Sequence, residues 1–256
     1  MIKIATWNVN SLRVRLPQVL NWLTSTAPDI VALQETKMTD EQFPLEEIQA
    51  AGYHALFSGQ KTYNGVALLS RSEGYDVIRD LPGLDDPQRR VLGATYDSLR
   101  VLNLYVPNGS AVGSDKYHYK LNWLNHLQHY IRNTKKHYPR FIVLGDFNIA
   151  PEDRDLYDPA AWAGNILVSP PERAALQDLF DLGLDDTFRL FEQPPACFSW
   201  WDYRAGAFQR NHGVRIDLIL ASQALSSNCT DCTIDIGPRR NERPSDHAPV
   251  VATFRV

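Results

Sequence analysis

Polar, oxygen-bearing side chains stand at or near the ends of several apolar, strand-like runs in this sequence. The runs cover residues 2–8, 30–35, 141–148, 215–220 and 248–254. The oxygen-bearing side chains are Asn8, Glu35, Asp146, Asn148, Asp217 and Asp246, and the imidazole of His247 follows Asp246. Strands fix position while the adjoining loops stay open to solvent, so strand ends often carry reactive groups. Because carboxylate and amide oxygens are hard ligands, the pattern predicts a dispersed site for Mg²⁺, with Mn²⁺ as an alternative.

A simpler interpretation is that each polar residue belongs to a turn or a cap, which is the commonest role of an Asp or Asn after a strand. Asp217 argues against it, because this carboxyl lies inside the apolar run 215–220. An unpaired charge there would cost several kcal/mol of desolvation. Asp217 therefore requires a buried partner, and a histidine is the natural one.

Length and composition indicate the domain number and the broad class of the protein. The chain has 256 residues, 44% of them hydrophobic, which is enough for one large core, so we expect a single domain covering residues 1–256. No run reaches the ~18 apolar residues of a membrane span, and no signal peptide precedes the first strand, which predicts a cytoplasmic protein. Cys229 and Cys232 have zinc-like spacing, but no second Cys or His pair nearby completes a site.

Between the strand-like runs, the apolar spacing becomes helical. Stripes with helical spacing are formed by Leu16, Val19, Leu20 and Leu23, and by Tyr117, Leu121, Leu124 and Ile131. Residues 169–172 form a capping-box sequence with prolines in the first turn, which predicts a helix ending at Gly183. Further strands are expected at 65–70 and 101–105. The elements therefore alternate between α and β along the chain.

The formal net charge of −4 does not exclude a nucleic-acid substrate, because net charge does not locate a binding site. Basic side chains are interleaved with aromatic or amide ones in three loop-like stretches, residues 61–64, 201–204 and 239–243. Such loops can hold phosphates and stack on sugars or bases. An isolated basic loop is more often solvated surface, so nearness to the acidic residues decides between the two interpretations.

Six sequence blocks resemble the motifs of one known family, in the family's order and from residue 6 to residue 250. The blocks are Trp7-Asn8-Val9-Asn10, Leu33-Gln34-Glu35-Thr36-Lys37, Tyr105-Val106-Pro107-Asn108-Gly109, Gly145-Asp146-Phe147-Asn148-Ile149-Ala150-Pro151, Arg215-Ile216-Asp217 and Ser245-Asp246-His247-Ala248-Pro249-Val250. They are similar to the exonuclease III family of DNA-repair nucleases, within the endonuclease/exonuclease/phosphatase superfamily. The resemblance implies a deoxyribonuclease I-like fold, a four-layer α/β sandwich of two packed β-sheets flanked by helices. It also implies a Mg²⁺-dependent enzyme that hydrolyses phosphodiesters of double-stranded DNA at 3′ ends and abasic sites, and we expect a monomer.

The resemblance assigns roles to the polar residues. The metal would be held within the set Asn8, Glu35, Asp146, Asn148, Asp246 and His247. Asp146 would handle the proton of the nucleophile or the leaving group, and in extended chain Asn148 would point the same way. His247 would pair with Asp217, which favours a charged imidazole. A charged His247 would bind the scissile phosphate and a neutral one could take a proton from water; the sequence leaves both open.

The substrate would meet a second group of residues. Tyr105 and Asn108 flank a turn after a strand, where a phenol and an amide both reach phosphate. Asn10 and Lys37 lie in the matching motifs and are assigned to substrate binding with Asn108. The expected walls of a pocket for a flipped-out abasic sugar are Trp200, Val214 and Ile216. Ordinary core packing explains these apolar residues equally well, and some relatives have a large aromatic residue in place of Val214.

Two other functions compete with this interpretation. Phosphatases of inositol lipids or sphingomyelin in the same superfamily share the acidic core, but the segments 61–65, 105–109 and 201–204 match the DNA-repair branch. A non-catalytic DNA-binding module would be expected to have lost at least one acid, and none is lost. The balance of exonuclease, 3′-phosphatase and abasic endonuclease activities, and the number of metal ions, are left open by the sequence.

Overall fold

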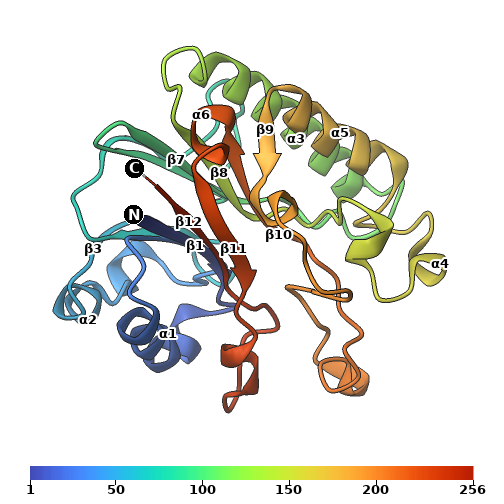
Figure 1. Cartoon of the computed structure of the whole chain (residues 1–256), viewed down its shortest axis with the longest axis horizontal. Coiled ribbons are helices and arrows are strands. Elements are labelled where there is room, and N and C mark those ends of the chain that lie inside the picture. The colour runs from blue at the N-terminus through green and yellow to red at the C-terminus, as the bar shows by residue number, and fades with distance from the viewer. Residues whose placement is uncertain (256) are drawn as a thin grey trace.

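Short apolar runs build two six-stranded sheets that pack face to face in this computed structural model, which describes residues 1–255 (Figure 1). The first sheet has the order β11-β12-β1-β2-β4-β3, with β1 Ile2–Asn8, β2 Ile30–Gln34, β3 His54–Ser58, β4 Val66–Ser70, β11 Cys229–Ile234 and β12 Val250–Phe254. The second has the order β5-β6-β7-β8-β10-β9, with β5 Tyr75–Ile78, β6 Val91–Tyr96, β7 Leu99–Tyr105, β8 Phe141–Asp146, β9 Leu184–Asp186 and β10 Asp217–Ser222.

Helices cover the outer faces of the two sheets. α1 Leu12–Thr26 and α2 Leu45–Ala50 lie on the first sheet, and α3 Asp115–Thr134 and α5 Pro170–Asp181 lie on the second. The short helices α4 Pro159–Trp162 and α6 Gln223–Ser226 lie in connections outside these two layers. Short 3₁₀ turns lie at Asp40–Gln42, Asp153–Asp155, Thr187–Leu190, Arg204–Gly206 and Gly237–Arg240. One apolar cluster fills the space between the sheets, a second joins the first sheet to α1 and α2, and a third joins the second sheet to α3 and α5. The expected four-layer sandwich is confirmed.

Each sheet contains one pair of parallel strands joined by a crossover helix. β1 and β2 are connected through α1, and β7 and β8 through α3. The carboxyl ends of parallel strands meet at the same edge of a sheet. β12 runs antiparallel to β1, and β10 runs antiparallel to β8, so both strands begin at that edge. Strand ends and strand starts from both sheets therefore converge.

Strand periodicity turns the polar residues at these ends toward the opposite sheet. Ile4 lies in the core between the sheets, and Asn8 lies four residues further on the same face of β1. Leu144 lies in the same core, and Asp146 lies two residues further on the same face of β8. Asp217 precedes the inward-facing Ile219 by two residues in β10. The site is thus the polar end of the core between the two sheets.

Hydrogen bonds beneath the site join the two sheets. Asn103 in β7 donates through Nδ2 to the carbonyl oxygens of Leu33 in β2 and Ala67 in β4, at 2.9 and 2.8 Å. Its Oδ1 accepts from Gln34 Nε2 at 2.8 Å, and Gln34 also donates to Thr6 Oγ1 in β1. Asn103 is fully buried. Because Gln34 precedes Glu35, this cluster fixes one metal-ligand candidate relative to the second sheet.

The helices largely follow their sequence signals. Ser169 and Glu172 form the predicted capping box at the start of α5, and Gly183 follows its end with φ +78°. The stripe of α3 differs in one position: Lys120 is fully buried, whereas Leu121 is only half-buried. A charged side chain inside an apolar stripe requires internal partners.

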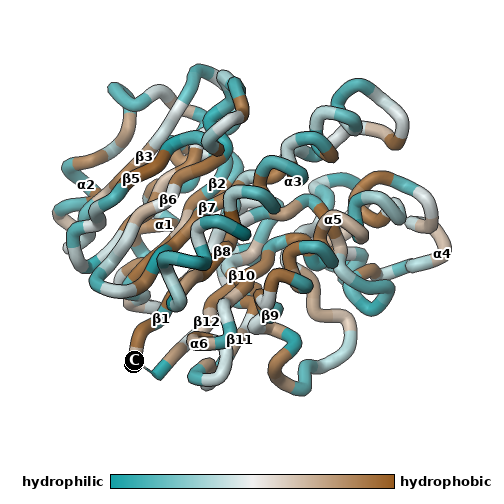
Figure 2. The backbone as a smooth tube through the Cα atoms, turned by 90° about the horizontal axis from the view of Figure 1, so that it is seen from above, coloured by the Kyte–Doolittle hydropathy of each residue, from teal (hydrophilic) through white to brown (hydrophobic). Residues whose placement is uncertain are grey.

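The distribution of hydrophobic residues agrees with the four-layer fold. In Figure 2 brown, hydrophobic stretches run along the strands, and teal, hydrophilic ones are concentrated in loops and on outer helix surfaces. Among residues 1–255, no helix has the length and apolar character needed to cross a membrane.

Candidate active site

Three side chains from three different strand ends form the centre of the site. Glu35 follows β2, Asp146 ends β8, and His247 lies shortly before β12. One ligand atom from each of them lies within 4.8 Å of the other two. The structure therefore brings together three of the residues expected at the metal, although they are far apart in the sequence.

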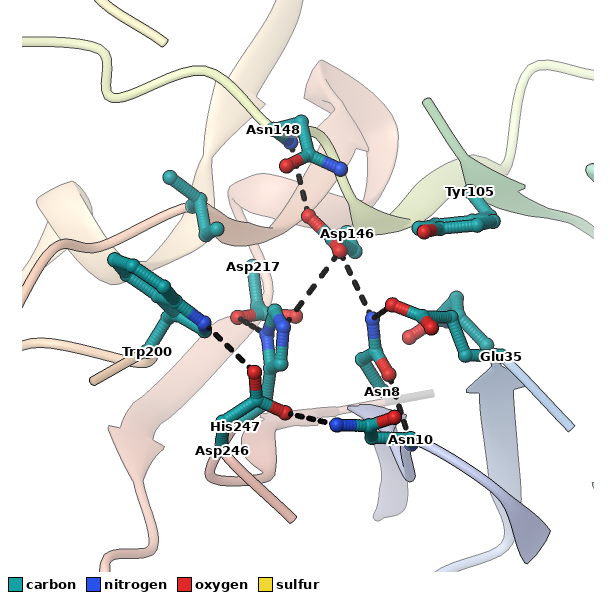
Figure 3. A network of polar contacts seen from close by, with 12 residues as sticks. Asn8, Asn10, Glu35, Tyr105, Asp146, Asn148, Trp200, Asp217, Asp246 and His247 are labelled. Carbon is teal, nitrogen blue, oxygen red and sulfur yellow. Dashed lines mark hydrogen bonds and ion pairs between the residues drawn. The ribbon is translucent and has the colours of Figure 1, made fainter. Parts of the chain in front are cut away.

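Asn8 bridges the two acids of this centre (Figure 3). Its Nδ2 donates to Glu35 Oε1 at 2.8 Å and to Asp146 Oδ2 at 2.9 Å. Its Oδ1 accepts the backbone N–H of Asn10 at 3.0 Å. Asn8 thus orients both carboxylates as a hydrogen-bond donor, and its role as a metal ligand stays a prediction.

His247 and Asp217 form a buried pair. His247 Nδ1 lies 2.8 Å from Asp217 Oδ2, and Nε2 lies 3.8 Å from Asp146 Oδ2. Burial alone lowers the pKa of His247, but the charges of Asp217 and Asp146 outweigh burial and raise this pKa well above its ordinary value. The buried partner that Asp217 requires is therefore His247, and the pair favours the charged imidazole.

Asp146 is almost completely buried, at 1% exposure. Burial is the largest influence and raises its pKa, the charge of His247 lowers it, and the charge of Asp217 raises it again. The net effect is a raised pKa. A carboxylate that is more basic than usual is suited to accept a proton near neutral pH.

The chain turns immediately after Asp146. Asn148 has a φ of +48°, and its N–H donates to Asp146 Oδ1 at 2.9 Å. The Oδ1 of Asn148 accepts from Asn108 Nδ2 at 3.0 Å, and its Nδ2 donates to the carbonyl oxygen of Val106 at 3.0 Å. The expectation that extended chain aligns Asp146 and Asn148 is wrong. A turn of the kind that Asp and Asn side chains stabilise brings them together instead.

Tyr105 ends β7 beside the same acids. Burial is the largest influence on its pKa, followed by the charges of Glu35 and Asp146, and all three raise it. The phenol therefore keeps its proton and can donate to a phosphate oxygen. The Arg90 guanidinium lies over the ring, 4.7 Å from its centroid, and holds the ring in place.

A line of hydrogen bonds connects the remaining polar candidates. Trp200 Nε1 donates to Asp246 Oδ2 at 3.0 Å, and Asn10 Nδ2 donates to Asp246 Oδ1 at 2.9 Å. Lys37 Nζ donates to Asn10 Oδ1 at 2.6 Å and lies 2.8 Å from Glu35 Oε2. Both oxygens of Asp246 are thus engaged by neighbouring side chains, and Asp246 is not one of the three residues of the central group.

The three expected pocket walls lie together beside His247. The backbone of Trp200 pairs with that of Val214 on one side and of His247 on the other. Val214 and Ile216 are 0% and 2% exposed and belong to an apolar cluster with Leu167, against which Trp200 packs. Two of the three residues are therefore core residues here, and a binding site for a flipped-out sugar stays a prediction.

All three basic and aromatic loops approach the acidic centre. A groove of about 480 Å³ opens beside Tyr105 and is lined by Tyr63 of the first loop. Tyr203 of the second loop accepts from Asn10 at 3.3 Å, and Arg239 of the third lies 5.8 Å from the Tyr203 ring. A larger cavity of about 850 Å³ shares no lining residue with the acidic centre. The loops, and not this larger cavity, form the surface beside the acidic residues.

Two serines near the centre have roles that the sequence did not reveal. Ser199 Oγ accepts the backbone N–H of Asp217 at 3.0 Å. Ser245 Oγ donates to the carbonyl oxygen of Asn8 at 2.6 Å and accepts the N–H of His247 at 3.2 Å. Their position next to acidic or aromatic motifs was the available signal, because a small hydroxyl there can bond the backbone of a neighbouring strand.

The donor set fits a hard divalent cation. Glu35 and Asp146 supply carboxylate oxygens, and the central group contains no cysteine. The charge of Glu35 contributes to the raised pKa of Asp146, so the two acids repel each other. A cation between them would relieve this repulsion. Magnesium and manganese both meet the requirement.

Comparison with known proteins gives consistent matches. Residues 5–247 match the model of the Endonuclease/Exonuclease/phosphatase family. Exodeoxyribonuclease III of Haemophilus influenzae is 38% identical, over 99% of this chain and 100% of that protein. The solved structure of 3′ phosphatase NExo (D146N) from Neisseria, bound to product DNA hairpin, is 49% identical, covers 100% of both chains and has a TM-score of 0.98. An AP endonuclease from Archaeoglobus fulgidus is 41% identical, again over 100% of both chains, with a TM-score of 0.96.

These matches extend over nearly the full sequence and include every strand end that contributes to the acidic centre. The acids therefore belong to the architecture that the chain shares with its relatives. On this evidence the chain is a member of the endonuclease/exonuclease/phosphatase family.

Proposed function

We propose that this protein is a Mg²⁺-dependent DNA-repair phosphodiesterase. It acts on double-stranded DNA at 3′ ends, as a 3′ to 5′ exonuclease and 3′-phosphatase, and at abasic sites. The observation that carries the proposal is the convergence of Glu35, Asp146 and the Asp217–His247 pair at one edge of the space between the sheets. Relatives described as an exodeoxyribonuclease III, a 3′ phosphatase and an AP endonuclease support it.

Asp146 handles the proton in this mechanism. A water oxygen forms a bond to phosphorus, the water proton passes to Asp146, and the bond from phosphorus to the departing sugar oxygen breaks. Asp146 can return the proton to that oxygen. In the metal-free protein burial raises the pKa of Asp146, which favours acceptance of the proton.

Other side chains hold the phosphate. The charged imidazole of His247 attracts a phosphate oxygen, and the phenol of Tyr105 donates to one. Asn108 and Asn148 each use one amide hydrogen within the protein, at 3.0 Å, and each has a second to offer. These donors stabilise charge that builds up in the transition state.

Glu35 and Asp146 would hold the divalent cation, with Asn8 fixing the orientation of both carboxylates. The bound cation would neutralise phosphate charge and lower the pKa of water. The charged state of His247 favours phosphate binding over metal ligation for this residue, since a protonated imidazole nitrogen cannot bind a metal.

The packing beside His247 bears on substrate choice. Val214 and Ile216 are buried in an apolar cluster, so an abasic sugar must displace or separate these side chains to enter. A 3′ terminus needs no flipped nucleotide. We therefore propose 3′ ends as the principal substrate and abasic sites as a second one.

A set of labelled duplexes tests the proposal. One carries a 3′-phosphate, one an undamaged recessed 3′ end and one an internal abasic site, each incubated with Mg²⁺ or with a chelator. We expect rapid Mg²⁺-dependent processing of the first two and slower incision of the third. Equal cleavage of duplexes with and without the lesion would show that the enzyme does not recognise abasic sites. If no duplex is cleaved, the proposed function is wrong. Hydrolysis of inositol phosphates under the same conditions would support the lipid-phosphatase alternative. We also propose that the protein is a cytoplasmic monomer. Analytical ultracentrifugation tests the oligomeric state.

A further inference from the structure

Lys120 in α3 is a charged residue with no access to solvent. It is 0% exposed. Its Nζ donates to the carbonyl oxygen of Asn148 at 2.7 Å and to that of Asn108 at 3.2 Å, and it forms an ion pair with the equally buried Glu172. Lys120 therefore cannot touch DNA, yet its three partners include the backbones of two proposed phosphate-binding residues.

Glu172 is itself held in place. Its Oε1 accepts the backbone N–H of Leu167 at 3.1 Å, and its Oε2 accepts the N–H of Ser169 at 3.1 Å and the hydroxyl of Ser169 at 2.6 Å. Tyr117, one turn before Lys120 in α3, shares a hydrogen bond of 2.7 Å with the same hydroxyl. Both members of the ion pair are thus anchored to the helices α3 and α5, which pack on the second sheet.

The two loops that Lys120 holds meet at the active site. Asn108 Nδ2 donates to Asn148 Oδ1 at 3.0 Å, and Asn148 adopts a φ of +48°. Within residues 1–255, no other hydrogen bond reaches the carbonyl oxygen of either asparagine. A Cβ added at Gly109 would lie 3.1 Å from Lys120 Cδ, so the loop also packs against the aliphatic part of this lysine.

Stability alone does not account for this arrangement. Replacing a buried ion pair by apolar residues of similar volume is often neutral or stabilising. A lysine ammonium offers three donors, which here reach a carboxylate and two carbonyl oxygens from separate loops. An apolar residue could fill the space but could not orient the two peptide groups.

We propose that Lys120, held by Glu172, is a positioning residue that sets the Asn108 and Asn148 amides against the phosphate of the scissile bond. This inference rests on the proposed function. It assigns a role in hydrolysis to a side chain that never contacts substrate.

The test compares three variants in the full chain. Lys120→Met removes the donors at similar length, and Lys120→Met/Glu172→Gln also neutralises the acid, which keeps a folded protein available if the single variant fails to fold. Leu127→Ala is the matched control, because Leu127 is buried two turns along the same face of α3 and has no polar side-chain atom that could orient either loop. We expect kcat on the 3′-phosphate duplex to fall about 10- to 100-fold in the folded lysine variants, with a smaller change in KM. Leu127→Ala should lower the melting temperature and leave kcat unchanged well below it.

A second measurement does not depend on activity. The side-chain amide signals of Asn108 and Asn148 are followed by ¹H–¹⁵N NMR in metal-free protein. In the lysine variants these signals should shift and their hydrogens exchange faster, and in Leu127→Ala they should not.

Wild-type kcat in a lysine variant, unchanged amide signals, or an equal loss of kcat in Leu127→Ala would each overturn the inference. If the wild-type protein hydrolyses none of the duplexes, the proposed function fails, whereas the amide signals still decide whether Lys120 holds the two asparagines.

Discussion

Asp146 has chemically different neighbours on its two oxygens. Asn8 donates to Oδ2, the backbone of Asn148 donates to Oδ1, and His247 Nε2 lies 3.8 Å from Oδ2. These contacts fix the orientation of the carboxylate, while burial raises its pKa. The same residue is therefore placed to face a cation and to move a proton, which makes it the most informative position for substitution.

Asp146→Asn should abolish turnover and preserve binding, because it removes the proton acceptor at nearly constant shape. We expect the single-turnover rate on the 3′-phosphate duplex to fall about 10²- to 10⁴-fold. Affinity for the duplex, measured by fluorescence anisotropy, should stay near that of the wild type. Asp153→Asn is the control, since this side chain is 71% exposed. A variant at Asp146 that keeps most of its activity would contradict the mechanism.

Glu35→Ala should first weaken the binding of Mg²⁺, because it removes one of the two carboxylates proposed to hold the cation. We expect the Mg²⁺ concentration for half-maximal activity to rise at least about tenfold. Titration of activity with Mg²⁺ measures this change, and the exposed Glu41→Ala variant serves as the comparison. An unchanged Mg²⁺ dependence would remove Glu35 from the ligand set.

His247 should titrate well above an ordinary histidine in metal-free protein. Burial opposes its charge, but Asp217 and Asp146 raise its pKa in the folded state. The folded protein then holds a proton that the unfolded chain releases, so this contribution to stability is full below the unfolded pKa of about 6.5 and falls as the pH rises above it. NMR titration of the imidazole measures the pKa, which Asp217→Asn should lower. Identical titrations of His247 in the two proteins would show that Asp217 does not hold the charge.

At the scale of elements, the site depends on how the two sheets are joined. Glu35 comes from the first sheet and Asp146 from the second, so any shift between the sheets separates them. Besides the Asn8–Asp146 hydrogen bond, Asn103 joins the sheets through hydrogen bonds from β7 to the backbones of β2 and β4. Its hydrogen bonds lie directly beneath the acids.

Asn103→Leu should therefore reduce both stability and activity. The substitution leaves buried carbonyl oxygens in β2 and β4 without this donor, at a cost of about 1–3 kcal/mol for each unsatisfied group. Urea unfolding measures the loss. Asn122→Leu on the exposed side of α3 should change the unfolding free energy by less than about 0.5 kcal/mol. A stable Asn103→Leu variant with full activity would show that the sheets are positioned by apolar packing alone.

At the scale of the whole molecule, the two sheets share one core. Strands from the beginning, middle and end of the chain contribute to it, because β1, β8 and β12 all send side chains between the sheets. Neither sheet can bury its apolar inner face without the other sheet. This arrangement supports the expectation of a single domain.

Unfolding should accordingly be one cooperative transition. Tryptophan fluorescence reports on both sides of the molecule, since Trp7 packs beside the first sheet and Trp123 beside the second. We expect urea transitions followed by fluorescence and by far-ultraviolet circular dichroism to coincide. Two separated transitions would indicate that the sheets belong to independently folding units.

Much of the site was predictable because the relevant signals are local. The runs around Asn8, Asp146 and Asp217 are short, mostly apolar and bordered by polar residues, as buried strands often are, and the buried Asp217 carboxyl required a partner. The partner proved to be His247, at a separation of 30 residues. Strand identity and the presence of a polar centre follow from such patterns.

Two features depended on longer-range geometry. The turn at Asn148 is stabilised by Asp146 and by Asn108, which is 40 residues away, so extended periodicity gave the wrong relation between Asp146 and Asn148. Lys120 was not among the residues of the predicted apolar stripe, and its buried ion pair with Glu172 was not predicted. Such contacts depend on which loops a helix meets after folding.

The sequence by itself determined the strands β1, β2, β4, β7, β8, β10 and β12, the long helices α1, α3 and α5, the capping box of α5 and the residue types of the acidic centre, because propensity, periodicity and capping act over a few neighbouring residues. The strands β3, β5, β6, β9 and β11 were not predicted. Only the tertiary structure decided how Glu35, Asp146 and His247 approach within 4.8 Å, how Asn103 joins the sheets and how Lys120 holds two loops. The physical reason is that these distances are set by the packing of two sheets on one shared core. No segment of the chain contains that information alone.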